Sequence, residues 1–298
     1  MPVRTLHVDR PLDLRLTLAI LRRGLGDPTI RLGTDAAVRA TRTPDGPATV
    51  HIRHLGDRLE GEAWGPGADR LLAALPALVG SDDDASALRP AHPVLRDAAR
   101  RLAGLRIGRT GNVMEALVPA ILEQKVTGTE AFRAWRLLVT RYGEPAPGPW
   151  DVWVPPPPDR LAALPYHAFH PLGVERRRAD TIRRVTARAG RIAELTELPL
   201  TEAYRRLTSF AGVGPWTAAE VALRALGDVD AVSIGDFHLP NLVSWALAGE
   251  PRGDDARMLE LLEPYRGQRG RVVRWLEASG TRPPAFGPRL APRSIAGI

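Results

Sequence analysis

A glycine-rich turn and an aspartate downstream of it are the residues whose types and spacing point most clearly to chemistry. The turn contains Gly212 and Gly214 and is followed by Pro215, and Asp236 stands in the later stretch SIGDFHLP. Glycine permits backbone conformations that other residues avoid, and proline suits the first turn of a helix. We therefore expect two helices joined by a hairpin with outward-facing N–H groups. Such a hairpin binds an anion such as phosphate, unless it merely connects the two helices.

Asp236 has two compatible interpretations. An aspartate just ahead of an amphipathic helix serves as its N-cap, a contribution of about 1 kcal/mol. A carboxylate in the same place is also able to stabilise positive charge that develops on a substrate. The local sequence does not choose between these roles.

The elements that position these residues fall into two parts. The first is an expected α+β domain over residues 1–85, which ends at a polar run where Asp84 or Ser86 would cap the next helix. It combines a helix-like run with three strand-like segments separated by turn residues, a pattern typical of an antiparallel meander. The helix is expected at 12–21 and the strands at 37–42, 49–54 and 58–64.

The second part is expected to be a mainly helical bundle over residues 86–280, because apolar residues recur there at the helical repeat. The expected helices span 95–102, 113–124, 128–142, 158–164, 175–192, 201–210, 215–226, 237–248, 254–262 and 269–278. The arginine-rich helix 175–192 either presents a solvated face or follows a nucleic-acid backbone. Residues 281–298 are expected to form a disordered tail, because they contain too few clustered apolar residues for a core.

The composition limits the class of protein. The chain has 298 residues, a net charge of +7 and no cysteine, which excludes disulfides and cysteine-ligated iron–sulfur clusters. The positive charge favours a polyanionic partner such as nucleic acid. No segment is apolar for long enough to span a membrane, and the N-terminus lacks the apolar core of a signal peptide. We expect a cytoplasmic monomer with no membrane partner.

Two stretches resemble a known family. The sequence LTSFAGVGPWTA, followed at this spacing by GDFH, resembles the helix-hairpin-helix, Gly/Pro-rich, aspartate signature of the base-excision DNA glycosylases. The segment MEALVPAILEQKV, residues 114–126, is similar to the AILxQxV helix of the bacterial 3-methyladenine DNA glycosylase II branch. That branch also begins with a small α+β domain, so the likeness covers most of residues 1–280.

The resemblance implies a monofunctional DNA glycosylase of base-excision repair. Such an enzyme flips a damaged base, here an alkylated purine, out of duplex DNA and hydrolyses its N-glycosidic bond. Asp236 matches the catalytic aspartate, which stabilises an oxocarbenium-like transition state and orients water. Bifunctional relatives carry a lysine two residues after the second hairpin glycine, where this chain has Trp216. We therefore expect hydrolysis without strand cleavage, and Lys125 is the only lysine in the sequence.

The base pocket is expected to include Trp216, Trp275 and Glu220. An alkylated purine is cationic, so aromatic faces favour it over a neutral base. Trp216 stands at a pocket position of the alkylpurine branch and Trp275 is a second candidate, although core packing also explains either tryptophan. Glu220 departs from the family pattern, which places an aromatic residue there. The identity of the damaged base therefore stays open.

The DNA contacts are expected around the hairpin. They are Gly212, Val213, Gly214, Thr217, His238, Gln124 and Lys125. Relatives insert a side chain near Lys125 into the gap left by the flipped base. The inserted residue is Lys125, Gln124 or Val126, unless Lys125 is an ordinary surface lysine. His238 matches a histidine that contacts DNA in oxoguanine-type glycosylases, or it is an ordinary surface or core histidine.

Ions and alternative activities complete the expectations. The resemblance implies a structural Na⁺ or K⁺ held by the main-chain carbonyls of Thr208, Phe210 and Val213, and it implies no other cofactor. The GDFH stretch is shared with oxidised-purine glycosylases, and bulky adducts are a further substrate class that the sequence leaves open. Hairpins of this kind also serve as non-catalytic grips on DNA.

Overall fold

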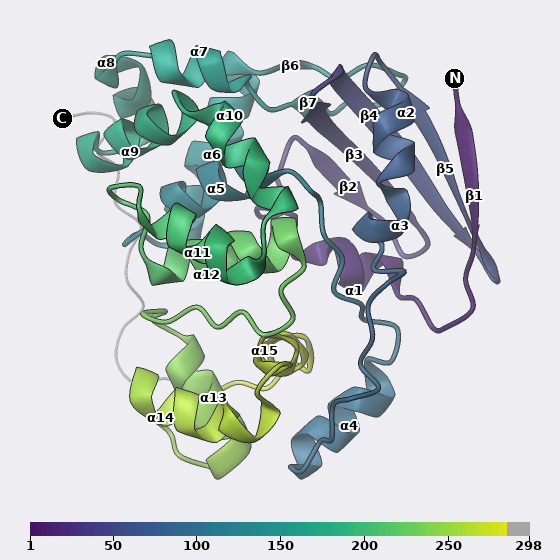
Figure 1. Cartoon of the computed structure of the whole chain (residues 1–298), viewed down its shortest axis with the longest axis vertical. Coiled ribbons are helices and arrows are strands. Elements are labelled where there is room, and N and C mark those ends of the chain that lie inside the picture. The colour runs from purple at the N-terminus through teal and green to yellow at the C-terminus, as the bar shows by residue number, and fades with distance from the viewer. Residues whose placement is uncertain (285–298) are drawn as a thin grey trace.

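A five-stranded antiparallel sheet forms one side of the computed structural model, which describes residues 1–284 (Figure 1). The strands are β1 (Val3–His7), β2 (Ile30–Leu32), β3 (Ala36–Thr43), β4 (Gly46–Leu55) and β5 (Arg58–Trp64), in the order β1-β5-β4-β3-β2. The three central strands contain the predicted segments, because short turns join strands whose alternating apolar residues face one core. The edge strands β1 and β2 were not predicted, since each is short and pairs with a single neighbour.

Three helices pack on one face of the sheet. They are α1 (Leu14–Ala19), α2 (Ala68–Ala73) and α3 (Leu75–Leu78). Leu18, Ile52 and Leu75 meet in the core between these helices and the sheet. The other face of β3 packs on the two-stranded sheet of β6 (Glu144–Pro145) and β7 (Trp153–Val154), where Val38 and Val154 are buried together.

The remainder of the described chain is helical. Its α-helices are α4 (Pro93–Arg101), α5 (Val113–Leu122), α6 (Gly128–Tyr142), α7 (Pro158–Ala163), α8 (Tyr166–Phe169), α9 (Arg176–Thr186), α10 (Ala189–Ala193), α11 (Leu200–Thr208), α12 (Pro215–Val221), α13 (Leu239–Ala248), α14 (Asp255–Leu262) and α15 (Arg269–Ala278). A π-helical turn, Ala222–Leu226, continues α12. None of the helices described in residues 1–284 is both long and apolar enough to cross a membrane.

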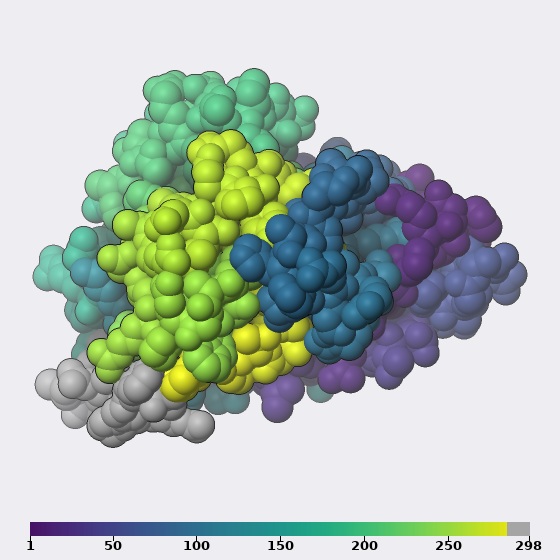
Figure 2. Space-filling model, turned by 90° about the horizontal axis from the view of Figure 1, so that it is seen from below, coloured from purple at the N-terminus to yellow at the C-terminus, as the bar shows by residue number. Residues whose placement is uncertain are grey.

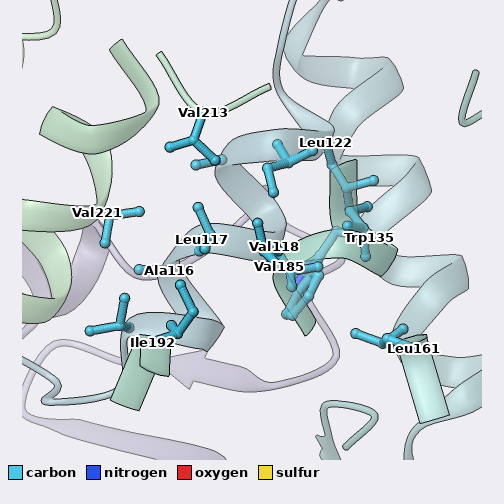
Figure 3. Packing of buried hydrophobic residues seen from close by; sticks show 14 of the residues in the cluster. Ala116, Leu117, Val118, Leu122, Trp135, Leu161, Val185, Ile192, Val213 and Val221 are labelled. Atoms are coloured by element: carbon cyan, nitrogen blue, oxygen red, sulfur yellow. The ribbon is translucent and has the colours of Figure 1, made fainter. Parts of the chain in front are cut away.

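The helical part contains two hydrophobic cores. The larger surrounds α5, from which Leu117 and Leu122 meet Val213 of the glycine turn (Figure 3). The smaller joins α4 to α13, α14 and α15. In Figure 2 the blue atoms of α4 lie against the yellow-green atoms of these C-terminal helices. The segment between the two cores carries Asp236.

Several predicted boundaries differ from the structure. The expected helix 175–192 is broken into α9 and α10, with Arg188 outside the helical region at φ −122°. The helix expected to start at Phe237 starts at Leu239. Asp84 does not cap the next helix, because its carboxylate accepts from the backbone of Ser86 and α4 starts only at Pro93. Most of the tail predicted to be disordered lies outside the described residues.

Candidate active site

The glycine turn joins α11 to α12 and has the geometry of a backbone anion site. Gly212 has φ +93°, and a Cβ at this position would lie 2.3 Å from the Thr181 hydroxyl, so a side chain is excluded. The first bond of α12 is Ala218 N–H to the Gly214 carbonyl, and within the described chain no side chain caps this helix end. The N–H groups of Gly214, Trp216 and Thr217 are therefore available to an anion at the positive end of α12.

Gln124 fastens the hairpin to the end of α5. Its Nε2 donates to the carbonyl of Gly212 at 2.9 Å and to the Thr217 hydroxyl at 2.8 Å. Gln124 is therefore held against the hairpin and does not project as a wedge in this structure, and the Thr217 side chain is only 2% exposed. The Val213 side chain is also buried, so Val213 and Thr217 can reach DNA only through their backbones.

The arginine-rich helix α9 supports the same hairpin. Ala179, Ile182 and Val185 face the core, as predicted. Arg178 is buried and donates to the carbonyl of Leu122 at the end of α5. Arg184 donates to the carbonyl of Ala211 in the hairpin at 2.6 Å. Two of its arginines are thus occupied by backbone acceptors that fix α5 and the hairpin relative to each other.

Asp236 lies beside this hairpin with its carboxylate held by three donors. One oxygen accepts from the backbone N–H groups of His238 at 2.7 Å and Leu239 at 2.9 Å, and so satisfies the first N–H of α13, although the N-cap position itself is His238. The other oxygen accepts from the indole Nε1 of Trp216 at 3.0 Å. Because Trp216 stands in the first turn of α12, this bond places the carboxylate directly next to the anion site. The capping and chemical roles of Asp236 are therefore compatible in space.

The loop that carries Asp236 is anchored to α11 and to α15 by two aspartates that precede Asp236. Asp228 accepts from the Tyr204 hydroxyl of α11 at 2.8 Å, and Asp230 accepts from the backbone N–H of Arg269 at the start of α15 at 2.9 Å. Burial, together with the nearby charge of Asp228, raises the pKa of Tyr204, so its hydroxyl keeps its proton and remains a donor. The loop therefore holds the carboxylate at a defined position between the two helical cores.

Phe237 is a site residue that the sequence interpretation missed. Its side chain is 75% exposed directly after Asp236, and its ring meets the His238 ring edge-on at 5.0 Å. His238 is also exposed. The sequence did contain a signal for Phe237. Aromatic residues are more often buried, so one in a polar turn next to the candidate carboxylate indicates a candidate contact with a ligand.

Glu220 anchors the Asp236 loop through a buried ion pair. Its carboxylate accepts from Arg224 at 2.6 Å and from the Ser233 hydroxyl at 2.6 Å, and Arg224 also donates to the carbonyl of Ile20 in the N-terminal part. Burial by itself raises the pKa of Glu220, but Arg224 and the Ser233 hydroxyl outweigh burial and hold it below its ordinary value. A charged carboxylate therefore occupies the position where the family pattern expects an aromatic ring.

Lys125 lies in the turn after α5 with an exposed side chain. Its φ is +55°, and it is the one non-glycine residue with a positive φ between residues 1 and 284. A side chain in this region of conformational space is strained, and such residues concentrate at functional sites. The strained turn follows Gln124 directly, so it borders the hairpin.

Curated relatives support the same family by sequence. No family model matches the chain. The putative DNA-3-methyladenine glycosylase YfjP of Bacillus subtilis is 26% identical over 161 residues, which cover 52% of this chain and 55% of the relative. The chain spans between 30% and 60% of the length of the curated relatives that it matches.

Solved structures share the fold over almost the whole chain. The 3-methyladenine DNA-glycosylase from Archaeoglobus fulgidus superposes with a TM-score of 0.79 and 19% identity, covering 93% of this chain and 98% of the other. MBOgg1 in complex with a low-affinity DNA ligand gives a TM-score of 0.74 and 18% identity, covering 93% and 95%. The chain therefore resembles a DNA-3-methyladenine glycosylase in sequence and shares the fold of a solved 3-methyladenine DNA-glycosylase. The predicted fold class, mainly α with an N-terminal antiparallel sheet, is confirmed.

Trp275, one of the predicted pocket residues, lies in a hydrophobic core. Trp275 of α15 is 5% exposed and packs with α4, α13 and α14, whereas Trp216 is part of the contacts around α5. The physical reason is that the apolar face of α15 is covered by three other helices. Of the two interpretations that the sequence leaves open for Trp275, its burial fits core packing, and a role in the base pocket stays a prediction.

The predicted cation ligands lie at the mouth of the hairpin. The carbonyl of Phe210 accepts from Val213 N–H at 2.9 Å, whereas no backbone N–H of the described residues is bonded to the carbonyls of Thr208 and Val213. Among residues 1–284 no group of His, Cys, Asp and Glu side chains is arranged to hold a metal. A monovalent ion bound by main-chain carbonyls at the negative end of α11 fits this donor set.

Proposed function

We propose that this protein is a monofunctional DNA glycosylase that flips an alkylated purine out of duplex DNA and hydrolyses its N-glycosidic bond. The observation that carries the proposal is the contact of Asp236 with Trp216, which joins a fixed carboxylate to the first turn of the hairpin helix. The likeness to 3-methyladenine glycosylases supports the same substrate class.

The chemistry follows from the position of the carboxylate. Breaking the bond between C1′ and the base leaves positive charge on the sugar, and the Asp236 carboxylate stabilises that charge and orients the attacking water. Its three hydrogen-bond donors fix the direction of the carboxylate before the substrate arrives. An alkylated purine is a cationic leaving group, so it needs little help from a general acid. The faces of Trp216 and the exposed Phe237 are suited to a flipped cation.

The hairpin and the turn at Lys125 are suited to the DNA itself. The open N–H groups of Gly212, Gly214, Trp216 and Thr217 would bind a backbone phosphate next to the flipped nucleotide, and His238 would approach the same strand. Lys125 would enter or border the gap that the base leaves. A Na⁺ or K⁺ ion on the carbonyls of Thr208, Phe210 and Val213 would add positive charge at the phosphate.

A damage panel tests this function. We expect the native protein to release N-alkylated purines, such as 7-methylguanine, from duplex DNA faster than deaminated or oxidised purines, because only the alkylated bases are cationic. Release is measured by alkaline cleavage of the abasic product across duplexes that include bulky adducts and crosslinks. Preferential release of an oxidised purine or a bulky adduct would show that this lesion, and not an alkylated purine, is the substrate. Binding without release of any base would indicate a non-catalytic DNA-structure binder.

Borohydride trapping tests the absence of strand cleavage. We expect almost no covalent adduct with damaged DNA, because Trp216 stands where a nucleophilic lysine would be and Lys125 is the only lysine. The adduct is measured as a shifted band on a denaturing gel beside a bifunctional glycosylase as positive control. Strong trapping that disappears in a Lys125→Gln variant would instead assign a lyase mechanism to Lys125.

A further inference from the structure

Leu25 is the most exposed of the large hydrophobic side chains described in residues 1–284. It is 89% exposed, at the tip of a Gly24-Leu25-Gly26 loop between α1 and β2. A solvent-exposed leucine contributes nothing to the core, and one such residue alone needs no explanation. Leu25 differs from an isolated surface leucine because its loop is held in place and lies beside the turn of Lys125.

The loop is fastened at its base by the buried carboxylate of Asp27, which is 1% exposed. One Asp27 oxygen accepts from Arg23 N–H at 2.6 Å. The other accepts from Thr29 N–H at 2.9 Å and from the indole of Trp135 at 3.2 Å. These bonds fix both ends of a four-residue turn, so the turn presents Leu25 to solvent in a defined direction.

The same loop is attached to the turn that contains Lys125. Arg23 forms an ion pair with Glu123 at 2.7 Å, two residues before Lys125, with both side chains largely buried. Gly24 has φ +76° and lies against Phe132 of α6, where an added Cβ would come within 2.8 Å of the ring. Glycine is therefore required at this contact, and the contact places the loop beside the first turns of the helix that follows Lys125.

The surroundings of Leu25 carry positive charge and border the candidate active site. The exposed Arg136 of α6 would lie 3.2 Å from a Cβ on Gly26, and Lys125 is exposed on the adjoining turn. On the other side, Arg224 donates to the carbonyl of Ile20 at the end of α1 and pairs with Glu220 on the helix that carries Trp216. Cations that flank an exposed apolar tip match the phosphates and stacked bases of a nucleic-acid duplex.

We propose that Leu25 enters the DNA duplex beside the flipped nucleotide and supplies the apolar contact that Lys125 does not. The inference rests on the proposed function, since it requires a duplex on the hairpin face. Proteins that unstack base pairs commonly insert leucine or phenylalanine between them, because an apolar side chain replaces the lost stacking contact. Burial of Leu25 between bases would then supply, in the complex, the hydrophobic stabilisation that this exposed side chain lacks in the free protein.

The test compares Leu25→Ala with Leu55→Ala, a matched change at an exposed leucine at the end of β4 on the sheet. The probe is a duplex with 2-aminopurine next to a tetrahydrofuran abasic analogue, in which fluorescence rises when the neighbouring base unstacks. We expect Leu25→Ala to lower the fluorescence rise and to weaken binding about tenfold, Leu25→Met to retain most of both, and Leu55→Ala to match the native protein.

The outcomes separate this inference from the proposed function. Native-like unstacking and binding by Leu25→Ala would overturn the role of Leu25, even if the native protein releases alkylated bases. Weaker unstacking by Leu25→Ala, in a protein that releases no base from any duplex, would support the role of Leu25 and refute the catalytic function. A native protein that does not unstack the probe at all would overturn this inference as well.

Discussion

Replacement of Asp236 by asparagine is expected to slow base release by about 10²- to 10³-fold without weakening DNA binding. Asparagine has the same shape, and its amide oxygen can keep the bonds from His238 and Leu239. It removes the negative charge beside the sugar, which acts only when positive charge develops in the transition state, and the oxygen that accepts from Trp216, because an amide nitrogen stands in its place. The rate is measured under single-turnover conditions on a duplex that contains 7-methylguanine.

The control for this prediction is Asp254→Asn. Asp254 caps α14 by accepting from Arg257 N–H at 2.8 Å, so the substitution makes the same chemical change at a neighbouring helix start. We expect Asp254→Asn to release base at the native rate, and both variants to bind an abasic-analogue duplex with native affinity. If Asp236→Asn retained the native rate, the carboxylate would be a cap alone and the proposed chemistry would be wrong.

Replacement of Arg224 by alanine is expected to lower the free energy of unfolding by about 3 to 5 kcal/mol. The substitution leaves the buried Glu220 carboxylate without its ion-pair partner and removes the bond to the Ile20 carbonyl, which connects α12 to the N-terminal part. The loop of Asp236 loses support through Ser233, so base release should also fall. Stability is measured by urea unfolding, and release under the conditions used for Asp236.

The loss of stability caused by Arg224→Ala is expected to depend on pH in a defined direction. Because the pKa of Glu220 is held below its ordinary value, its stabilising contribution is present above its unfolded pKa and is lost as the pH falls through the lower folded value. The destabilisation by Arg224→Ala should therefore be largest near neutral pH and smaller in acid, where Glu220 is protonated in the variant.

A solvent-exposed ion pair provides the matched control for Arg224. Arg257 pairs with Glu250 at the same distance of 2.6 Å, but both side chains are about one-third exposed or more. Water and salt screen such a pair, so Arg257→Ala should change stability little at any pH. Equal losses from Arg224→Ala and Arg257→Ala would show that burial of the Glu220 pair has no special energetic effect.

The elements around the candidate site could be predicted because their signals are local. Pro215 after Gly214 indicates where α12 begins, and the helical repeat of apolar residues predicts α5 and α6 to within a few residues. Phe237, which follows Asp236 directly, was available to the same reasoning and was missed. The broken helix at Arg188 was not predictable, because its apolar repeat continues on both sides of the break.

Partners far apart in the chain could not be predicted in this way. Nothing in the sequence indicated that the Thr217 hydroxyl is bonded to Gln124, and the sequence left both a pocket and a core position open for Trp275, which lies in the second helical core. Glu220 was read as a pocket residue without any sign of its bonds to Arg224 and Ser233. Residue type and helical face are the same for a buried partner and an exposed contact, so the sequence pattern does not distinguish them.

The sequence by itself determined the order of helices and central strands, the hairpin and the aspartate that follows it, because turn chemistry and apolar periodicity act between near neighbours. Only the tertiary structure decided that Asp236 meets Trp216, that Glu220 is held by Arg224, and that Leu25 stands exposed beside the turn of Lys125. These contacts depend on how separate elements pack in three dimensions. Packing sums many weak interactions over the whole chain, and no short stretch of residues encodes it.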